Sequence, residues 1–140
     1  MTEPLAGGCL CGAIRFSVSH PISELRACHC THCQKASGAG GSVNAVVPAG
    51  SFAITKGAPK LFAGTAQSGR ILNRFFCGDC GSPVYSQRAD TPQLRVVRAG
   101  AFDSALNVKI TCNIWTASAR PWMHIDPASE RHPGNLPPKS

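Results

Sequence analysis

The sequence predicts a mainly β fold, a single domain of short strands organised around metal. Three observations lead to this prediction. Fourteen glycines and eleven prolines are spread along 140 residues, and turn residues this frequent favour many short strands over long helices. Several short runs alternate between apolar and polar residues. The eight cysteines fall into three groups and one isolated residue, Cys112.

Strand-like runs follow one another along the chain. In residues 13–19, Ile14, Phe16 and Val18 share one face, which is the period of a strand with one buried side. Further strands are expected over residues 42–47, 51–55, 71–76, 83–87, 93–100 and 107–115. Helix signals are weak, and only residues 31–36 and 103–107 are expected to form a turn or two.

The composition is that of one globular domain, with 43% hydrophobic and 15% charged residues. We expect this domain over residues 1–125, followed by a proline-rich polar tail over 126–140 that lies over the surface or is loose. Neither a signal peptide nor a run of roughly 18–20 apolar residues is evident. A cytoplasmic protein without a membrane partner is therefore expected, where cysteines are metal ligands or reactive thiols more often than disulfides.

The formal net charge of +7 would, taken alone, indicate an anionic partner such as nucleic acid. However, the basic residues are scattered, and aromatic residues that could stack on bases make up only 6% of the chain. Seven thiolates on two Zn²⁺ ions would also reduce the charge to about +4. A nucleic-acid partner is thus not favoured. An exposed strand edge could pair two chains into a homodimer, although no particular residue indicates it.

The motif CGDCG at 77–81 is typical of a zinc knuckle. Its CxxC spacing lets both sulfurs face one ion, and its glycines permit tight turns whose backbone N–H groups point at thiolates. The CxC motif of Cys9 and Cys11 is the natural source of two more ligands. Cys9, Cys11, Cys77 and Cys80 would then close a structural zinc site. A thioredoxin-like motif is the alternative, but no helical period follows Cys80.

The remaining group of cysteines lies in the segment CHCTHC and consists of Cys28, Cys30 and Cys33. Three protein ligands on zinc leave one coordination position open, which is typical of catalytic sites. A small thiol suits that position, because zinc deprotonates it near neutral pH. The alternative is a second closed site, completed by His29, His32 or Cys112. Of these, Cys112 is expected to be a buried strand thiol rather than a ligand.

The segments that hold the cysteine motifs resemble the glutathione-dependent formaldehyde-activating enzyme family, which includes centromere protein V. The similar segments are GGCLCGAIRF, CHCTHCQKASG, RFFCGDCGSPVYS, LRVVRAGAFD and IWTASARPWMHID. The resemblance implies a β-tent fold of short antiparallel strands with two zinc ions per chain. It assigns the structural ion to Cys9, Cys11, Cys77 and Cys80, and the substrate-side ion to Cys28, Cys30 and Cys33. Many relatives have histidine where this chain has Asn113, and an aromatic residue near Gly40 or Gly41.

The function that the resemblance implies is that of a carbon–sulfur lyase, which adds a small thiol, glutathione, reversibly to formaldehyde or a similar aldehyde. Cys28, Cys30 and Cys33 would hold the zinc that binds the thiolate, and His29 or His32 could protonate the carbonyl oxygen. Three basic residues are candidates to bind the carboxylates of glutathione: Lys35, Arg74 and Arg120. The alternative is a non-catalytic zinc module that binds nucleic acid or protein. Trp115 and Trp122 are expected to pack in the core or at an interface, with a pocket wall as the alternative.

Overall fold

The computed structural model describes residues 3–66 and 69–136. Within them the chain forms two β-sheets, the helix α1 (Thr31–Ser37) and three 3-10 helices. The smaller sheet has the order β1 (Leu5–Gly8), β2 (Arg15–Val18) and β5 (Phe52–Lys56). The larger sheet has the order β11 (Glu130–Arg131), β10 (Ile110–Ile114), β3 (Leu25–Cys28), β4 (Ser42–Pro48), β9 (Leu94–Arg98), β8 (Pro83–Arg88), β7 (Ile71–Phe76) and β6 (Lys60–Thr65). The 3-10 helices are Ala49–Ser51, Ala99–Ala101 and Thr116–Ser118.

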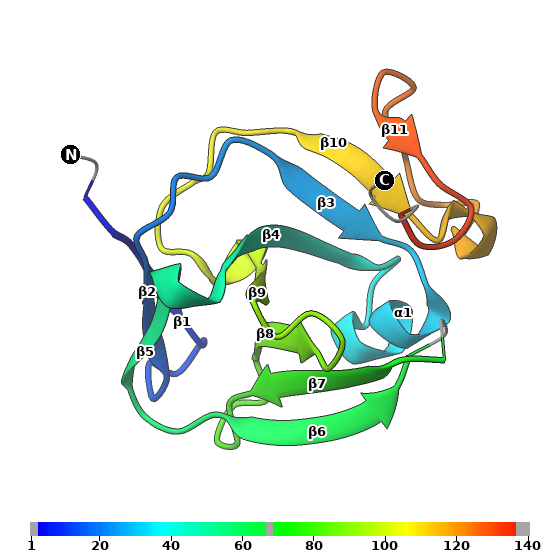
Figure 1. Ribbon diagram of the computed structural model, residues 1–140. Helices are drawn as coiled ribbons and strands as arrows, with labels where there is room; N and C mark the ends of the chain where they lie inside the picture. The colour runs from blue at the N-terminus through cyan, green and yellow to red at the C-terminus, as the bar shows by residue number, and fades with distance from the viewer. Residues whose placement is uncertain (1–2, 67–68, 137–140) are drawn as a thin grey trace.

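The larger sheet bends over on itself. Figure 1 shows β10, β3 and β4 along the top of the molecule and β7 and β6 along the bottom, with α1 between the two limbs on the right. Among the described residues, no helix is long and apolar enough to cross a membrane.

The predicted β class is confirmed, and the helix expected at 31–36 is α1. The helical turn expected at 103–107 is wrong, because no helix forms there. Tertiary contacts hold this segment irregular: the Asp103 N–H donates to the Ala6 carbonyl at 2.9 Å, and the Asp103 carboxylate pairs with Arg15. Not every strand is antiparallel, since β10 runs parallel to both β3 and β11.

The core lies between the two sheets and is centred on Phe16, which is 1% exposed. Its ring packs edge-on against Phe102 at 5.3 Å between centroids and tilted against Phe52 at 5.4 Å. A Cβ atom on Gly7 would collide with the Phe16 ring and the Ala101 carbonyl oxygen. Glycine at this position therefore lets β1 approach the core closely.

Candidate metal centres and their cavity

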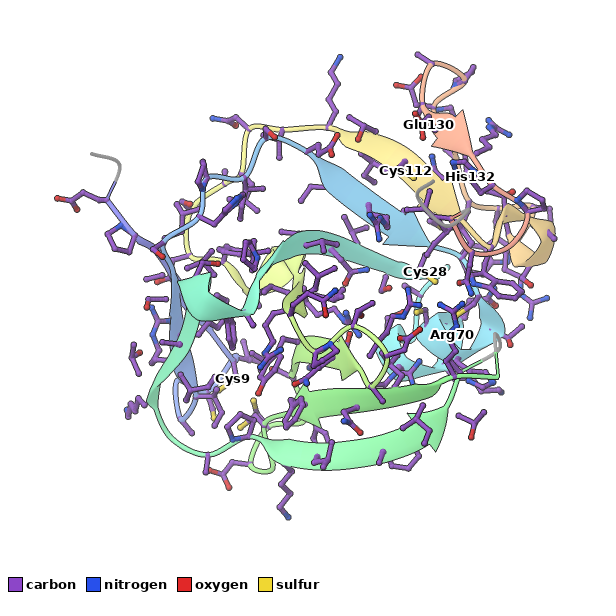
Figure 2. All side chains as sticks on the ribbon, viewed as in Figure 1. Cys9, Cys28, Arg70, Cys112, Glu130 and His132 are labelled. Atoms are coloured by element: carbon purple, nitrogen blue, oxygen red, sulfur yellow. The ribbon has the colours of Figure 1, made fainter. Side chains whose placement is uncertain are left out.

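All eight cysteines are free, and seven of them form two separate clusters. Cys9 belongs to the cluster beside the smaller sheet, and Cys28 to the cluster at the far end of β3 (Figure 2). The fold therefore brings together the same two sets of sulfurs that the spacing of the motifs predicts.

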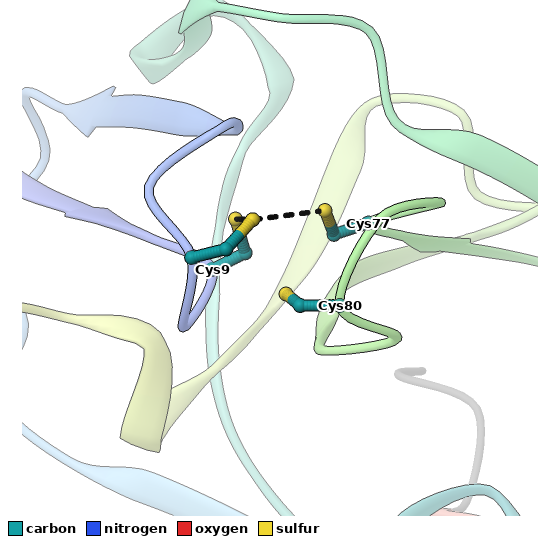
Figure 3. Close-up of side chains that lie close together, drawn as sticks. Cys9, Cys77 and Cys80 are labelled. Carbon is teal, nitrogen blue, oxygen red and sulfur yellow. Dashed lines mark hydrogen bonds between the residues drawn. The ribbon is translucent and has the colours of Figure 1, made fainter.

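The first cluster joins the turn after β1 to the turn after β7, and consists of Cys9, Cys11, Cys77 and Cys80. Figure 3 shows the sulfurs turned toward one another across the gap between the two turns. The Cys11 Sγ atom lies 3.6 Å from that of Cys9 and 3.7 Å from that of Cys77. A tetrahedral zinc ion with Zn–S bonds of about 2.3 Å holds its sulfurs about 3.8 Å apart. The donor set and its spacing therefore fit a closed tetrahedral zinc site.

Backbone donors surround this first cluster. The Ile14 N–H donates to the Cys9 sulfur at 3.2 Å, and the Asp79 N–H donates to the Cys77 sulfur at 3.4 Å. Hydrogen bonds from the hydroxyl and backbone of Ser82 lower the pKa of Cys80 to about 5. Such donors stabilise negative sulfur, which is the form that binds a metal ion.

The second cluster is built at the start of α1. Cys28 ends β3, Cys30 caps the helix, and Cys33 lies in its first turn, so that the three sulfurs are within 4.8 Å of one another. The Cys33 N–H donates to the Cys30 sulfur at 3.3 Å. On the other side, Gly41 lies against the Cys28 carbonyl oxygen so closely that a Cβ atom would collide with it.

These three sulfurs compete for protons. Hydrogen bonds with Cys30 and Cys33 raise the pKa of Cys28 well above its usual range, whereas those with Cys28 and Cys30 hold the pKa of Cys33 far below it. A divalent cation relieves such competition by replacing the shared protons. The cluster could therefore hold a metal ion, and its three thiols are consistent with zinc.

A cavity opens directly onto the second cluster, and five arginines line it: Arg26, Arg70, Arg74, Arg88 and Arg98. The three cysteines of the cluster, Trp115 and Asn135 are also part of its wall. The Asp90 carboxylate pairs with two of these arginines, with Arg70 at 3.0 Å and with Arg88 at 2.9 Å. Guanidinium groups thus outnumber carboxylates strongly, and the cavity is positively charged.

Two of these guanidinium groups are buried beside the sulfurs. Arg98 donates to the Asn44 side-chain oxygen at 2.5 Å. Its pKa is lowered, mainly by burial and further by the charge of Arg74, although the nearby Cys33 acts in the opposite direction. The Nε and Nη2 atoms of Arg74 are buried and have no hydrogen-bond partner among residues 3–66 and 69–136. Two buried donor atoms without a partner are costly, as is the charge of a second guanidinium nearby, and an anionic ligand would offset both costs.

The structure places the other predicted residues outside this cavity lining. His29 is 2% exposed and its Nε2 atom lies 3.1 Å from the Asn113 side-chain oxygen, while His32 is half-buried on α1. Lys35 is exposed on α1, and Arg120 donates to the Gln34 side chain at 2.6 Å. Of the three basic residues predicted to bind carboxylates, Arg74 therefore lies in the cavity.

Each tryptophan has a different environment. Trp115 lines the cavity, and its indole N–H donates to the Asn135 side-chain oxygen at 2.8 Å. Trp115 is also the one non-glycine residue with a positive φ among the described residues, at 57°. Trp122 is 67% exposed and lies outside the core, so of the two expected roles, core or interface packing, the core role is wrong and the interface role stays a prediction.

The two positions at which the chain departs from many relatives have a structural context. Asn113 is buried, and its side chain connects His29 with Ser129 and the Glu130 carbonyl of the tail. A Cβ atom at Gly40 would overlap the side chain of Met123. Met123 therefore occupies the space that a larger residue at position 40 would need.

Four of the cavity arginines have no distinctive signal in the sequence and were not predicted as site residues: Arg26, Arg70, Arg88 and Arg98. An arginine that alternates with apolar residues in a strand is a weak signal by itself. Arg26 in LRAC and Arg98 in LRVVR both have this form.

Comparison with known proteins agrees with this geometry. Residues 4–118 match the family model described as glutathione-dependent formaldehyde-activating enzyme. A protein of Halomonas elongata with the provisional name glutathione-dependent formaldehyde-activating enzyme is 32% identical over 107 residues, 73% of this chain and 68% of that protein. The crystal structure of a Rhodobacter sphaeroides protein has the same fold, with a TM-score of 0.59 and 21% identity over 76% of this chain and all of the other. Since the family model covers most of the chain and the cysteine motifs lie within it, the protein belongs to the glutathione-dependent formaldehyde-activating enzyme family.

Proposed function

We propose that the protein is a carbon–sulfur lyase that adds a small anionic thiol, glutathione, reversibly to formaldehyde or a similar aldehyde. The reaction uses two zinc ions per chain, a structural ion at Cys9, Cys11, Cys77 and Cys80 and a substrate-side ion at Cys28, Cys30 and Cys33. The observation that carries the proposal is the position of an arginine-lined cavity directly on the three-sulfur cluster.

The cavity suits a thiol that carries carboxylates. Glutathione has two carboxylates, and an arginine binds a carboxylate through two parallel hydrogen bonds. Arg74 has two buried nitrogen atoms available for such bonds, and Arg70 lies with Cys28 on the right side of the molecule, away from Cys9 (Figure 2). The arginines thus orient the thiol group toward the cluster and hold the charged ends away from it.

The reaction forms one carbon–sulfur bond and moves one proton. The thiol sulfur attacks the carbonyl carbon, and the carbon–oxygen double bond becomes a single bond. The thiol releases its proton to water, and the oxygen takes up a proton from water, so the protons balance. Zinc, when bound to the three cysteines, supplies a Lewis acid that keeps the incoming thiol deprotonated near neutral pH. Arg98, fixed by its hydrogen bond to Asn44, stabilises the negative charge that develops on the oxygen.

The proton reaches the product oxygen from water in the open cavity. His29 and His32 are the donors that the sequence predicts, but the cavity lining does not include them. Substitution of His29 by Gln, which can still form a hydrogen bond to Asn113, distinguishes protonation by water from protonation by the His29 imidazole. A rate unchanged in this variant supports water as the donor, and a large loss of rate supports the imidazole.

The test is the rate of exchange between glutathione, formaldehyde and their adduct at equilibrium, measured by nuclear magnetic resonance. Wild-type protein is compared with Cys30→Ser and with a reaction that contains no protein. The wild type should accelerate exchange, and Cys30→Ser should not. Equal rates in all three samples would remove the proposal.

The alternative of a nucleic-acid-binding module is tested by a titration with duplex DNA at increasing salt concentration. Binding driven by phosphate contacts weakens steeply as salt rises. Five of the nine arginines line one cavity, which favours a small anion over a duplex. The thiols that the two clusters require also suit a reducing compartment such as the cytoplasm.

A further inference from the structure

A third group of ligand-type side chains lies outside both cysteine clusters, at the edge of the larger sheet. The Cys112 Sγ atom, a carboxylate oxygen of Glu130 and a ring nitrogen of His132 lie within 4.8 Å of one another. Figure 2 shows the three side chains next to each other, Cys112 on β10, Glu130 on β11 and His132 just after β11. The proposed reaction uses none of them.

Strand pairing brings these side chains together. Strand β11 pairs with β10 in parallel, and its register places Glu130 opposite Cys112. Side chains two residues apart in a strand lie on the same face, so His132 follows Glu130 on the face of Cys112. The Nε2 atom of His132 is 3.3 Å from the Glu130 carboxylate.

The backbone that carries the three side chains is firmly held. The buried Asn113 amide donates to the Ser129 hydroxyl at 2.8 Å and to the Glu130 carbonyl at 3.0 Å. The His132 N–H donates to the Asn113 carbonyl at 2.9 Å, and the His132 carbonyl accepts from the Thr116 N–H at 3.1 Å. Donor groups on a fixed backbone bind an ion with little loss of conformational entropy.

The chemistry of the group suits a borderline divalent cation. Thiolate, imidazole and carboxylate are the three ligand types that zinc takes in proteins, and about 3.3–3.8 Å separates the ligand atoms in a tetrahedral site. The present separations need only small side-chain movements to reach that range. Burial raises the pKa of Cys112, the nearby guanidinium of Arg26 lowers it, and the nearby carboxylates of Glu130 and Glu24 raise it.

We propose that Cys112, Glu130 and His132 form a third metal site, which takes Zn²⁺ or a similar borderline divalent cation. Such an ion cross-links β10 to the segment that follows residue 126. This segment also contributes Asn135 to the wall of the cavity. The ion would therefore fix one side of the cavity without contacting the three-sulfur cluster.

The test measures how fast iodoacetamide alkylates Cys112 in the full chain, read at this residue by mass spectrometry. Added zinc should slow alkylation of Cys112 by about tenfold or more in the wild type, because the bound thiolate is withdrawn from reaction. Magnesium, which prefers oxygen ligands, should have no effect. In His132→Gln the zinc effect should be lost, and in the control His124→Gln, which changes an exposed histidine nearby, it should persist.

Equal alkylation of wild-type Cys112 with and without zinc would overturn the proposal, as would full protection in His132→Gln. Zinc content by elemental analysis, after dialysis against dilute zinc, gives a second measurement. Cys112→Ala and His132→Gln should each contain one zinc ion fewer per chain than the wild type, and an equal content would count against the site. Both readouts are independent of whether the three-sulfur cluster catalyses thiol addition.

Discussion

Substitution of Arg74 by Met should weaken binding of the anionic thiol and leave the folded protein equally stable or more stable. Met preserves the apolar stem of Arg74 but removes the guanidinium. Two nitrogen atoms of the Arg74 guanidinium, Nε and Nη2, are buried without a hydrogen-bond partner in the part of the chain that the structure describes. Each buried, unsatisfied donor costs about 1–3 kcal/mol, so their removal relieves that cost and offsets any loss of packing.

The expected effect of Arg74→Met on thiol binding is unfavourable, whereas its effect on stability is neutral or favourable. A hydrogen bond to a charged group contributes about 1.5–3 kcal/mol, which corresponds to about 10- to 150-fold in the dissociation constant. The KM for glutathione should therefore rise by about that factor in Arg74→Met. The KM for an uncharged thiol such as 2-mercaptoethanol should stay near that of the wild type, since it has no carboxylate for Arg74 to bind.

Two measurements test this prediction: urea unfolding of the ligand-free protein and exchange kinetics with both thiols. Arg120→Met is the matched control, because Arg120 is exposed and donates to Gln34 outside the cavity lining. An Arg74→Met variant that unfolds at lower urea and keeps the wild-type KM would refute the reasoning. An equal rise in KM for the charged and the uncharged thiol would refute it too, because it would indicate a general distortion of the cavity.

Three further predictions concern stability. Cys77→Ser should lower the midpoint of thermal unfolding by about 10 °C or more, since a structural zinc site contributes to folding directly. Cys30→Ser should lower this midpoint less. Equal shifts in the two variants would argue against the structural role of the first cluster. Phe16→Ala should lower the free energy of unfolding in urea by about 3–5 kcal/mol, because the ring is 1% exposed. A decrease below about 1 kcal/mol would contradict the central place of Phe16 in the core. The hydrogen bond from Arg15 lowers the pKa of Asp103 from its ordinary 3.8. The stability that this pair contributes is therefore present above pH 3.8, and it is lost as the pH falls through the lower pKa of Asp103 in the folded protein. Asp103→Asn should thus destabilise the protein at neutral pH and have no effect in strong acid, and a difference from the wild type that is the same at both pH values would exclude this explanation.

Local signals in the sequence were sufficient for the β class and for the division of the cysteines. Apolar alternation in residues 13–19 predicts β2, since a strand with one buried face requires that period. The sulfurs of a CxC, CxCxxC or CxxC motif are neighbours in the chain, so each group stays together in almost any fold. The same holds for α1, whose cap is Cys30 itself. The strands β1, β3, β6 and β11 were not predicted, because each is short or lacks a clear alternation.

The cavity and the third group of ligands depended on tertiary structure. Arg26, Arg74 and Arg98 lie on β3, β7 and β9, and only the order of strands in the larger sheet turns them to one cavity. Likewise, Cys112 meets Glu130 because a two-residue strand pairs in parallel with β10. No local pattern specifies either arrangement, since the contacts join residues far apart in the chain and follow from how the sheet bends and pairs.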